Sequence, residues 1–193
     1  MRLDNSLDDL FATGSHVRVL RALDGLPEDL SVSGREIARR AGVSQPTAAD
    51  VLRSLEGQGL LVIGRRLRAA FYRLNPDHVL TPAVRQLFAR ESAVRSELET
   101  AVADRVYGLR GVAAAYLFGS AARGDMRAES DIDVAIQSKD AVPEEIGSLD
   151  QVHRRFGNRV SVIRLRARGA SGLRASVKRE GRLLPRKRRP KIS

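Results

Sequence analysis

The chain has 193 residues, which is enough for one medium domain or two small ones. It contains no cysteine, which excludes a disulfide framework and a cysteine-based zinc site. The N-terminus lacks the pattern of a signal peptide and no apolar run reaches the length of a membrane span, so we expect a cytoplasmic protein without membrane contact. The net charge of +11 and the pI of about 11.1 favour polyanionic partners such as nucleic acid.

Two short helices are predicted in the first third of the chain. The capping-box pattern of Ser33 and Glu36 starts the first helix, and Gly42 ends it. Ser44 caps the second helix, over about 45–58. Its apolar residues recur at three- and four-residue spacing, at Ala48, Val51, Leu52 and Leu55. Two helices joined by a tight glycine-containing turn are typical of a helix-turn-helix.

Two strand-like runs, 60–64 and 69–74, follow on either side of a basic segment and predict a β-hairpin. With a helical apolar pattern over 5–25, these elements make a winged helix. Residues 5–78 resemble the ArsR- and MarR-like bacterial repressors, notably in Val43-Ser44-Gln45-Pro46-Thr47 and Gly59-Leu60-Leu61. We therefore predict a winged helix-turn-helix domain over residues 1–78 that binds double-stranded DNA.

The second helix of such a domain enters the major groove, and the hairpin tip reaches the backbone or a minor groove. The predicted DNA-binding residues lie on the helix start, its outward face and the tip: Ser44, Gln45, Thr47, Ala49, Arg53, Arg65, Arg66 and Arg68. Glutamine pairs with adenine, and arginine pairs with guanine or phosphate. Asp50 opposes this interpretation because a carboxylate repels phosphate, although it can accept from cytosine. A winged helix that makes only protein contacts is the alternative.

One long helix is predicted over 79–107. Its apolar residues follow heptad spacing, at Val84, Leu87, Val94, Leu98 and Ala101, and Glu91 interrupts the series. This linker helix is either a dimerisation seam or a strut packed on a domain. Because DNA sites are commonly two-fold, we expect a homodimer.

A candidate site follows the apolar run 112–118, which predicts a buried strand. The run stops at Gly119 and Ser120, where a helix start can hold phosphate and glycine lets the backbone approach a ligand. The next strand carries Asp131 and Asp133, whose side chains point to one face because residues alternate along a strand. Adjacent carboxylates repel unless a cation lies between them, and hard oxygen ligands suit Mg²⁺.

The remaining chain predicts a helix over 143–156, a third strand over 159–165 and a last helix over 170–184. Residues 186–193 form a basic tail, which either adds affinity for nucleic acid or is only a solvated segment. The three histidines are scattered over separate elements and suggest no catalytic arrangement.

Taken together, Gly119-Ser120, Ala122-Arg123-Gly124 and Ser130-Asp131-Ile132-Asp133 resemble the DNA polymerase β-like nucleotidyltransferases, and most of all their minimal prokaryotic members. The resemblance covers about residues 108–185. It implies that Asp131 and Asp133 are the catalytic residues and the metal ligands for Mg²⁺. It also implies that Gly119, Ser120 and Arg123 bind a nucleoside triphosphate, expected to be ATP. In this family an acceptor hydroxyl attacks the α-phosphorus and pyrophosphate leaves.

The third carboxylate of this family is the main departure. Active members usually carry it on the next strand, where Ser161 stands in this chain. No Asp or Glu lies between Asp150 and Glu180, so a small shift of alignment does not supply one. A serine cannot hold a second metal as a carboxylate does. The departure counts against catalysis, whereas nucleotide binding through one metal does not need this group.

The predicted fold class is α+β, with a winged helix domain and a small mixed-sheet nucleotidyltransferase domain joined by a long helix. The first predicted function is a DNA-binding protein that binds Mg-NTP and transfers NMP to a protein or nucleic-acid acceptor. Minimal members of the resembled family often pair with a HEPN toxin, so a toxin protein is one expected partner and an RNA acceptor another. The alternative is a transcriptional regulator whose degenerate transferase domain is a nucleotide sensor or an oligomerisation scaffold.

Overall fold

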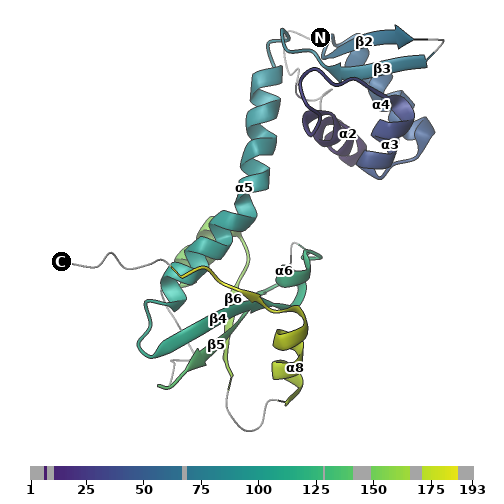
Figure 1. The fold of residues 1–193 in the computed structure, drawn as a ribbon. Coiled ribbons are helices and arrows are strands. Elements are labelled where there is room, and N and C mark those ends of the chain that lie inside the picture. Colours follow the sequence, from purple (N-terminus) through teal and green to yellow (C-terminus); the bar gives the residue numbers. More distant parts are fainter. Residues whose placement is uncertain are drawn as a thin grey trace. The chain divides into compact units, whose positions relative to one another are not determined.

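The computed structural model describes residues 7, 11–66, 69–127, 129–140, 149–165 and 171–186. The chain divides into two compact units, Met1–Ser92 and Ala93–Ser193, and the boundary between them lies inside helix α5 (Thr81–Val106). The two units are drawn in Figure 1. No described helix is long and apolar enough to cross a membrane.

The helices of the first unit begin at hydroxyl caps. They are α2 (Gly14–Asp24), α3 (Gly34–Ala41) and α4 (Gln45–Gly57), preceded by Thr13, Ser33 and Ser44. Each cap hydroxyl accepts a hydrogen bond from the backbone N–H three residues later, which is worth about 1 kcal/mol to a helix. Gly42 ends α3 at a φ of 62°, a conformation that favours glycine. The predicted helix-turn-helix is therefore α3, Gly42 and α4.

The carboxylate of Glu36 points along α3. Ser33 Oγ accepts from the Glu36 N–H at 3.3 Å, which is one half of the predicted capping box. The Glu36 side chain accepts from Arg39 at 2.6 Å and from Arg40 at 2.7 Å. These hydrogen bonds lower the pKa of Glu36 to about 2.

The wing is an antiparallel hairpin of β2 (Leu61–Arg66) and β3 (Ala69–Leu74), as predicted. A further strand, β1 (Val32–Ser33), pairs with β3, so that the order in the described sheet is β1-β3-β2. The sequence did not predict β1. Two residues are too few to show the alternation that identifies a strand.

The core of the first unit is built from the apolar stripes of α2, α3 and α4 together with the hairpin. Its fully buried residues include Leu20, Ile37, Leu52, Leu55 and Leu60. Burying one such side chain stabilises the fold by about 1.5–3 kcal/mol. The first turns of α5 complete this core with the buried residues at 84 and 88.

Helix α5 does not carry one continuous heptad seam. Val84 is buried, but Leu87 and Val94 are each 50% exposed. Glu91, which interrupts the predicted series, forms an ion pair with Arg21 of α2 at 2.6 Å. The start of the helix also differs from a simple cap, because the Thr81 hydroxyl donates to the carbonyl of Asn75 at 2.6 Å.

The second unit contains a mixed sheet, as predicted. Its described strands are β4 (Val112–Phe118), β5 (Ile132–Ser138), β6 (Val160–Arg164) and β7 (Arg182–Leu183), in the order β6-β5-β4-β7. Strand β5 is antiparallel to β4 and parallel to β6, and β7 is antiparallel to β4. This sheet and the winged helix confirm the predicted α+β class.

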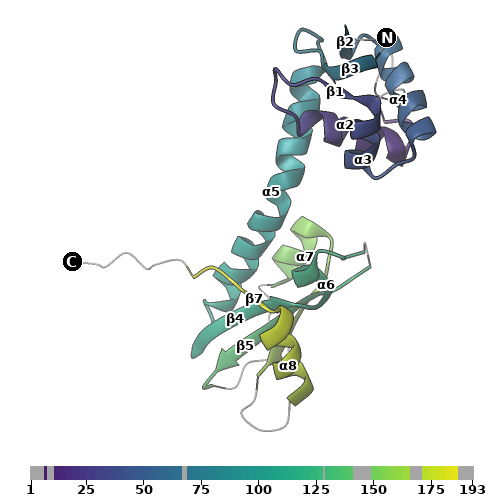
Figure 2. The same ribbon diagram turned by 45° about the vertical axis from the view of Figure 1, so that its right-hand side comes forward.

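The sheet is covered by helices on both faces (Figure 2). One face packs Leu117, Val134 and their neighbours against the second half of α5 and against α7 (Asp150–Phe156). The opposite face packs Phe118 and Ala135 against Val177 of α8 (Ser171–Glu180). Strand alternation places Asp133 on the face that α8 covers.

The end of the described chain runs alongside β4 and pairs with it. Helix α8 stops at Glu180, earlier than the predicted 184, and the short strand β7 follows. Leu184 is buried, and its carbonyl accepts from the hydroxyl of Tyr107 at 3.2 Å. The guanidinium of Arg186 lies 5.4 Å from the ring centre of Tyr107. The rest of the predicted basic tail, 187–193, lies outside the described residues.

Candidate functional site

The turn from β4 to helix α6 (Gly119–Arg123) brings the backbone against a carboxylate. Gly119 has a φ of 68°, in the left-handed region. A Cβ added to it would lie 2.8 Å from Oδ2 of Asp133. Only glycine fits here without a shift, because a side chain would both strain the backbone and push the carboxylate away.

Asp131 and Asp133 lie at the start of β5. Asp131 is exposed directly before the strand, and Asp133 is half-buried at its second residue, opposite Phe118 of β4. Burial raises the pKa of Asp133, and the negative charge of Asp131 raises it further. No hydrogen bond from a described residue offsets these effects at Asp133. Two neighbouring carboxylates without a cationic partner among the described residues are the ligand set that a divalent cation would complete.

Ser161 lies beside this pair. The parallel register of β5 and β6 sets Ser161 directly opposite Asp133. Side chains at paired positions point to the same face of a sheet, so the position nearest Asp133 on the neighbouring strand is a hydroxyl. The described residues contain no group of three or more His, Cys, Asp or Glu that could hold a metal ion.

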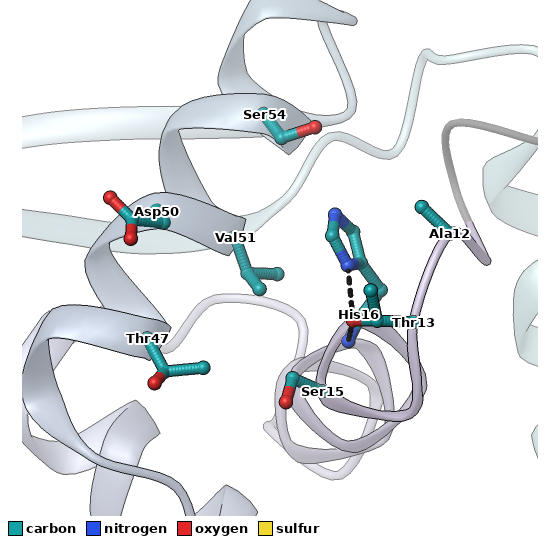
Figure 3. A pocket seen from close by; sticks show the side chains of 8 residues that line it. All are labelled: Ala12, Thr13, Ser15, His16, Thr47, Asp50, Val51 and Ser54. Carbon is teal, nitrogen blue, oxygen red and sulfur yellow. Dashed lines mark hydrogen bonds between the residues drawn. The ribbon is translucent and has the colours of Figure 1, made fainter.

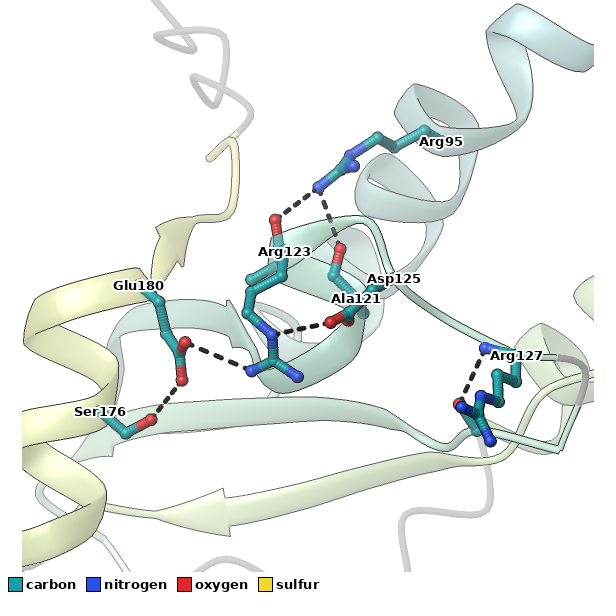
Figure 4. Close-up of polar contacts among 9 residues, drawn as sticks. Arg95, Ala121, Arg123, Asp125, Arg127, Ser176 and Glu180 are labelled. Carbon is teal, nitrogen blue, oxygen red and sulfur yellow. Dashed lines mark hydrogen bonds and ion pairs between the residues drawn. The ribbon is translucent and has the colours of Figure 1, made fainter. Parts of the chain in front are cut away.

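Arg123 lies at the end of α6 inside a polar network (Figure 4). Its Nε donates to Asp125 at 3.1 Å and its Nη1 donates to Glu180 at 3.3 Å. The Ser176 hydroxyl donates to the other oxygen of Glu180 at 2.5 Å. Ser176 and then Arg123 lower the pKa of Glu180, which keeps this carboxylate charged.

Arg95 of α5 holds α6 from the other side. Its Nη2 donates to the carbonyls of Ala121 at 2.9 Å and Ala122 at 3.0 Å, which are among the last carbonyls of α6. A cation at this end satisfies acceptors that a five-residue helix leaves unpaired. Glu99, which is almost fully buried, accepts from Arg95 Nε at 3.2 Å.

The predicted DNA-binding residues of α4 fall into two groups. Ser44 and Thr47 are engaged in the helix cap, with 2.7 Å between their hydroxyl oxygens. Gln45 and Ala49 are exposed on the outer face. Arg53 is exposed and pairs with Asp50 at 3.1 Å, so the acidic residue that opposed the DNA interpretation is neutralised by its neighbour.

The predicted arginines of the wing lie at its tip. Arg65 is exposed near the end of β2. The backbone of Arg66 pairs with that of Ala69, and nothing further is described of its side chain. Arg68 lies outside the described residues.

A hollow of about 460 Å³ lies between the first turn of α2 and the side of α4 that carries Thr47, Asp50 and Val51 (Figure 3). The imidazole of His16 points between the two helices, and its Nδ1 lies 2.9 Å from the Thr13 hydroxyl oxygen. Burial lowers the pKa of His16, which favours the neutral ring. Thr47 and Asp50 line the opposite wall.

Sequence reasoning missed Glu180, Ser176 and Arg95. Glu180 is 57 residues from Arg123, and Arg95 is 26 residues from Ala121. None of them belongs to a local motif. The one signal was position: Glu180 ends the stretch without an acidic residue that surrounds Ser161.

Two family models match the chain. The model described as polymerase beta, nucleotidyltransferase, matches residues 104–189, and the model of the MarR family matches residues 13–66. The chain therefore combines a MarR-like winged helix with a nucleotidyltransferase domain of the polymerase β type. No curated protein matches it significantly.

Three solved structures illustrate what the chain is similar to. One chain of the structure of the tri-AMPylated HEPN toxin of Shewanella oneidensis in complex with MNT antitoxin matches at 19% identity and a TM-score of 0.38, over 48% of this chain and 73% of that one. A MarR family transcriptional regulator of Silicibacter pomeroyi matches at 23% and 0.39, over 52% and 75%. A homodimeric winged helix-turn-helix domain of Mycobacterium bovis, from a possible ArsR-family regulator, matches at 23% and 0.33, over 50% and 92%.

Proposed function

We propose that this protein is a DNA-binding regulator whose second unit binds a divalent metal–nucleoside triphosphate, Mg-ATP being the expected form. The observation that carries the proposal is the close approach of the Gly119 backbone to the Asp133 carboxylate beside Asp131, where an added Cβ would lie 2.8 Å from Oδ2. It joins a close backbone turn to a pair of carboxylates for which the described residues supply no positive charge. The two family matches support DNA binding by the first unit and nucleotide binding by the second.

The chemistry of the pair supports metal binding. Asp131 and Asp133 would hold the metal, which would neutralise their repulsion and the charge of the phosphates. Arg123 would add positive charge one helical turn after Gly119. Ser120 and the close turn at Gly119 would bind the triphosphate, as the family resemblance implies.

Ser161 favours binding over transfer. Opposite Asp133, a serine offers neither a second anionic ligand nor a base at neutral pH. A second candidate function is NMP transfer to a protein or nucleic-acid acceptor, including a toxin protein. The intact Asp pair and the polymerase β family match favour this candidate.

Titration calorimetry with Mg-ATP tests nucleotide binding. We expect Asp131→Asn to weaken binding at least about 100-fold, since it removes a charged metal ligand. Glu129→Gln, which removes an exposed carboxylate two residues before Asp131, is the matched control and should bind within about five-fold of wild type. Equal binding by wild type and Asp131→Asn would contradict the proposed site.

Labelled ATP tests turnover. We expect little transfer of label to protein or nucleic acid by the wild type, and more by Ser161→Asp, which supplies a third carboxylate. Efficient transfer by the wild type that is lost in Asp131→Asn would establish the second candidate. Unchanged inactivity of Ser161→Asp would show that another part of the transferase machinery is also missing.

DNA binding is supported by the exposed outer face of α4, by Arg65 on the wing and by the net charge of +11. We also propose that the protein binds DNA as a homodimer. The half-exposed Leu87 and Val94 on α5 support a second chain at that helix. Retardation of promoter DNA at low salt, with the mass of the complex from sedimentation, tests both. A monomeric complex would contradict the dimer.

A further inference from the structure

We propose that Glu180, oriented by Ser176, is a positioning residue: it holds Arg123 so that the free end of the guanidinium meets a phosphate of the bound nucleotide. The proposal rests on Mg-NTP binding by the second unit. It assigns a role to the last helix, which carries none of the residues of the Gly-Ser and Asp-x-Asp motifs.

The guanidinium of Arg123 is held at two of its three nitrogens. Nε donates to Asp125 and Nη1 donates to Glu180. The second terminal nitrogen, Nη2, makes no hydrogen bond with the residues that the structure describes. A guanidinium is a planar fork, so two fixed nitrogens also fix the direction of the third.

Glu180 is itself fixed more firmly than Arg123. Its side chain is 18% exposed, against 47% for Arg123. Ser176, one helical turn earlier, donates to its other oxygen, and Val177 anchors α8 on the sheet. Glu180 therefore ties Arg123 to the packed helix α8, in addition to the hydrogen bond that Arg123 makes with Asp125.

We assign the nucleotide site as the target of Nη2 because the helix that carries Arg123, α6, begins at Gly119 beside the Asp133 carboxylate. Gly119, at the other end of α6, lies so close to the Asp133 carboxylate that a Cβ would not fit between them. Arg95 donates to the carbonyls of Ala121 and Ala122, at the end of α6 nearer Arg123. The backbone that carries Arg123 is thus fixed relative to the Asp pair. Each named contact is made within the second unit.

The two carboxylates beside Arg123 also offset its charge, so an opposite role must be separated from positioning. If Glu180 masked Arg123, removing Glu180 would strengthen phosphate binding. If Glu180 positions Arg123, removing it weakens binding. Glu180→Gln distinguishes charge from position, because glutamine keeps an acceptor for Arg123 and a partner for Ser176 while it removes the negative charge.

The experiment is titration calorimetry with Mg-ATP on the full chain. We expect Arg123→Ala to weaken binding about 10- to 100-fold, the range of one charge-assisted hydrogen bond. We expect Glu180→Ala to weaken it about 5- to 10-fold and Glu180→Gln to bind as well as wild type or better. In the Arg123→Ala background, Glu180→Ala should have no further effect, because Glu180 acts only through Arg123.

Three outcomes overturn the proposal. Unchanged or tighter binding by Glu180→Ala assigns Glu180 to no role or to masking. A loss of the same size in the Arg123→Ala background assigns it to the stability of α8, which thermal unfolding of the same variants would show. If the wild type does not bind Mg-ATP while it still retards DNA, the nucleotide proposal fails and the role of Glu180 fails with it.

Discussion

The two units place their candidate functional residues in opposite ways. In the winged helix, Gln45, Ala49 and Arg53 lie on the outside of a helix whose inner face makes the core. In the second unit, Asp133 is half-buried on the sheet, and Arg123 is hydrogen-bonded to Glu180 of α8, 57 residues later in the chain.

This difference separates function from stability in one unit and couples them in the other. An exposed DNA contact can be replaced without disturbing the packing beneath it. A half-buried carboxylate such as Asp133, which has no cationic partner among the described residues, destabilises the folded state, and a bound cation would remove this cost. Substitutions in the second unit should therefore change binding and stability together.

The largest expected effect comes from Asp133→Asn. Mg-ATP binding should fall at least about 100-fold because a charged metal ligand is lost. The unliganded second unit should become more stable at pH 7, by about 2–4 °C if the gain is about 0.5 kcal/mol. The pKa of Asp133 is raised in the folded state, so the wild type loses stability as pH rises through that pKa.

Titration calorimetry with Mg-ATP measures the effect on binding. Thermal unfolding at pH 7 and at about pH 3.5 measures the effect on stability. The stability difference should shrink at the lower pH. There the Asp133 carboxyl of the wild type is largely protonated, and the asparagine of the variant is neutral at any pH. A variant that is less stable than wild type at pH 7 would contradict the coupling of site and stability.

The second largest effect is expected for Gly119→Ala, as a loss of stability. The left-handed backbone and the contact at 2.8 Å with Asp133 predict a loss of about 1–3 kcal/mol from the second unit. Gly64→Ala on the wing is the matched control, because a Cβ there meets nothing within 4 Å. Hydrogen exchange read separately over each unit measures both. Equal effects of the two substitutions would remove the contrast between the units.

Replacing Arg53 and Arg65 together by alanine should weaken binding to promoter DNA about ten-fold and lower the salt dependence of that binding. Thermal unfolding should be unchanged, because both side chains are exposed. The control replaces two exposed arginines of the second unit, Arg110 and Arg127, by alanine, so that the net charge falls by the same amount. A double variant that melts earlier than wild type would show that these arginines stabilise the fold.

The smallest effect is expected for Glu36→Gln on α3. The pKa of Glu36 is lowered from 4.5 to about 2 by Arg39 and Arg40. The stabilisation by this carboxylate is therefore present above pH 4.5 and is lost as pH falls towards 2. The melting temperatures of variant and wild type should converge on acidification, and a constant difference would contradict the assignment. The carboxylate and both arginines lie on the surface of the helix, so the effect is that of a surface ion pair.

The winged helix was largely predictable because its information is local. Caps at Ser33 and Ser44, the glycine between the helices and the apolar spacing of α4 are each read within a few residues. The strands β1 and β7 were not predictable, since each has two residues and is defined by its pairing with β3 or β4. Their places depend on partners elsewhere in the chain.

The candidate transferase site was predictable as a motif and less so as a geometry. The spacing of Asp131 and Asp133 identified the pair, and the third strand brought Ser161 opposite Asp133. The anchoring of Arg123 by Glu180 could not be predicted, because it depends on how α8 crosses the sheet. A side-chain contact between residues 57 apart leaves no trace in local periodicity.

Helix α5 has a consequence for dissecting the protein. Its buried residues at 84 and 88 belong to one core, and those at 102 and 106 belong to the other. A fragment that ends before the helix would lack residues 84 and 88 of the first core. A fragment that begins after the helix would lack residues 102 and 106 of the second core. Stable fragments of either unit must therefore include part of this helix, with the cut inside it near residue 92. The two folding units share one uninterrupted piece of secondary structure, so the point at which they join contains no loop.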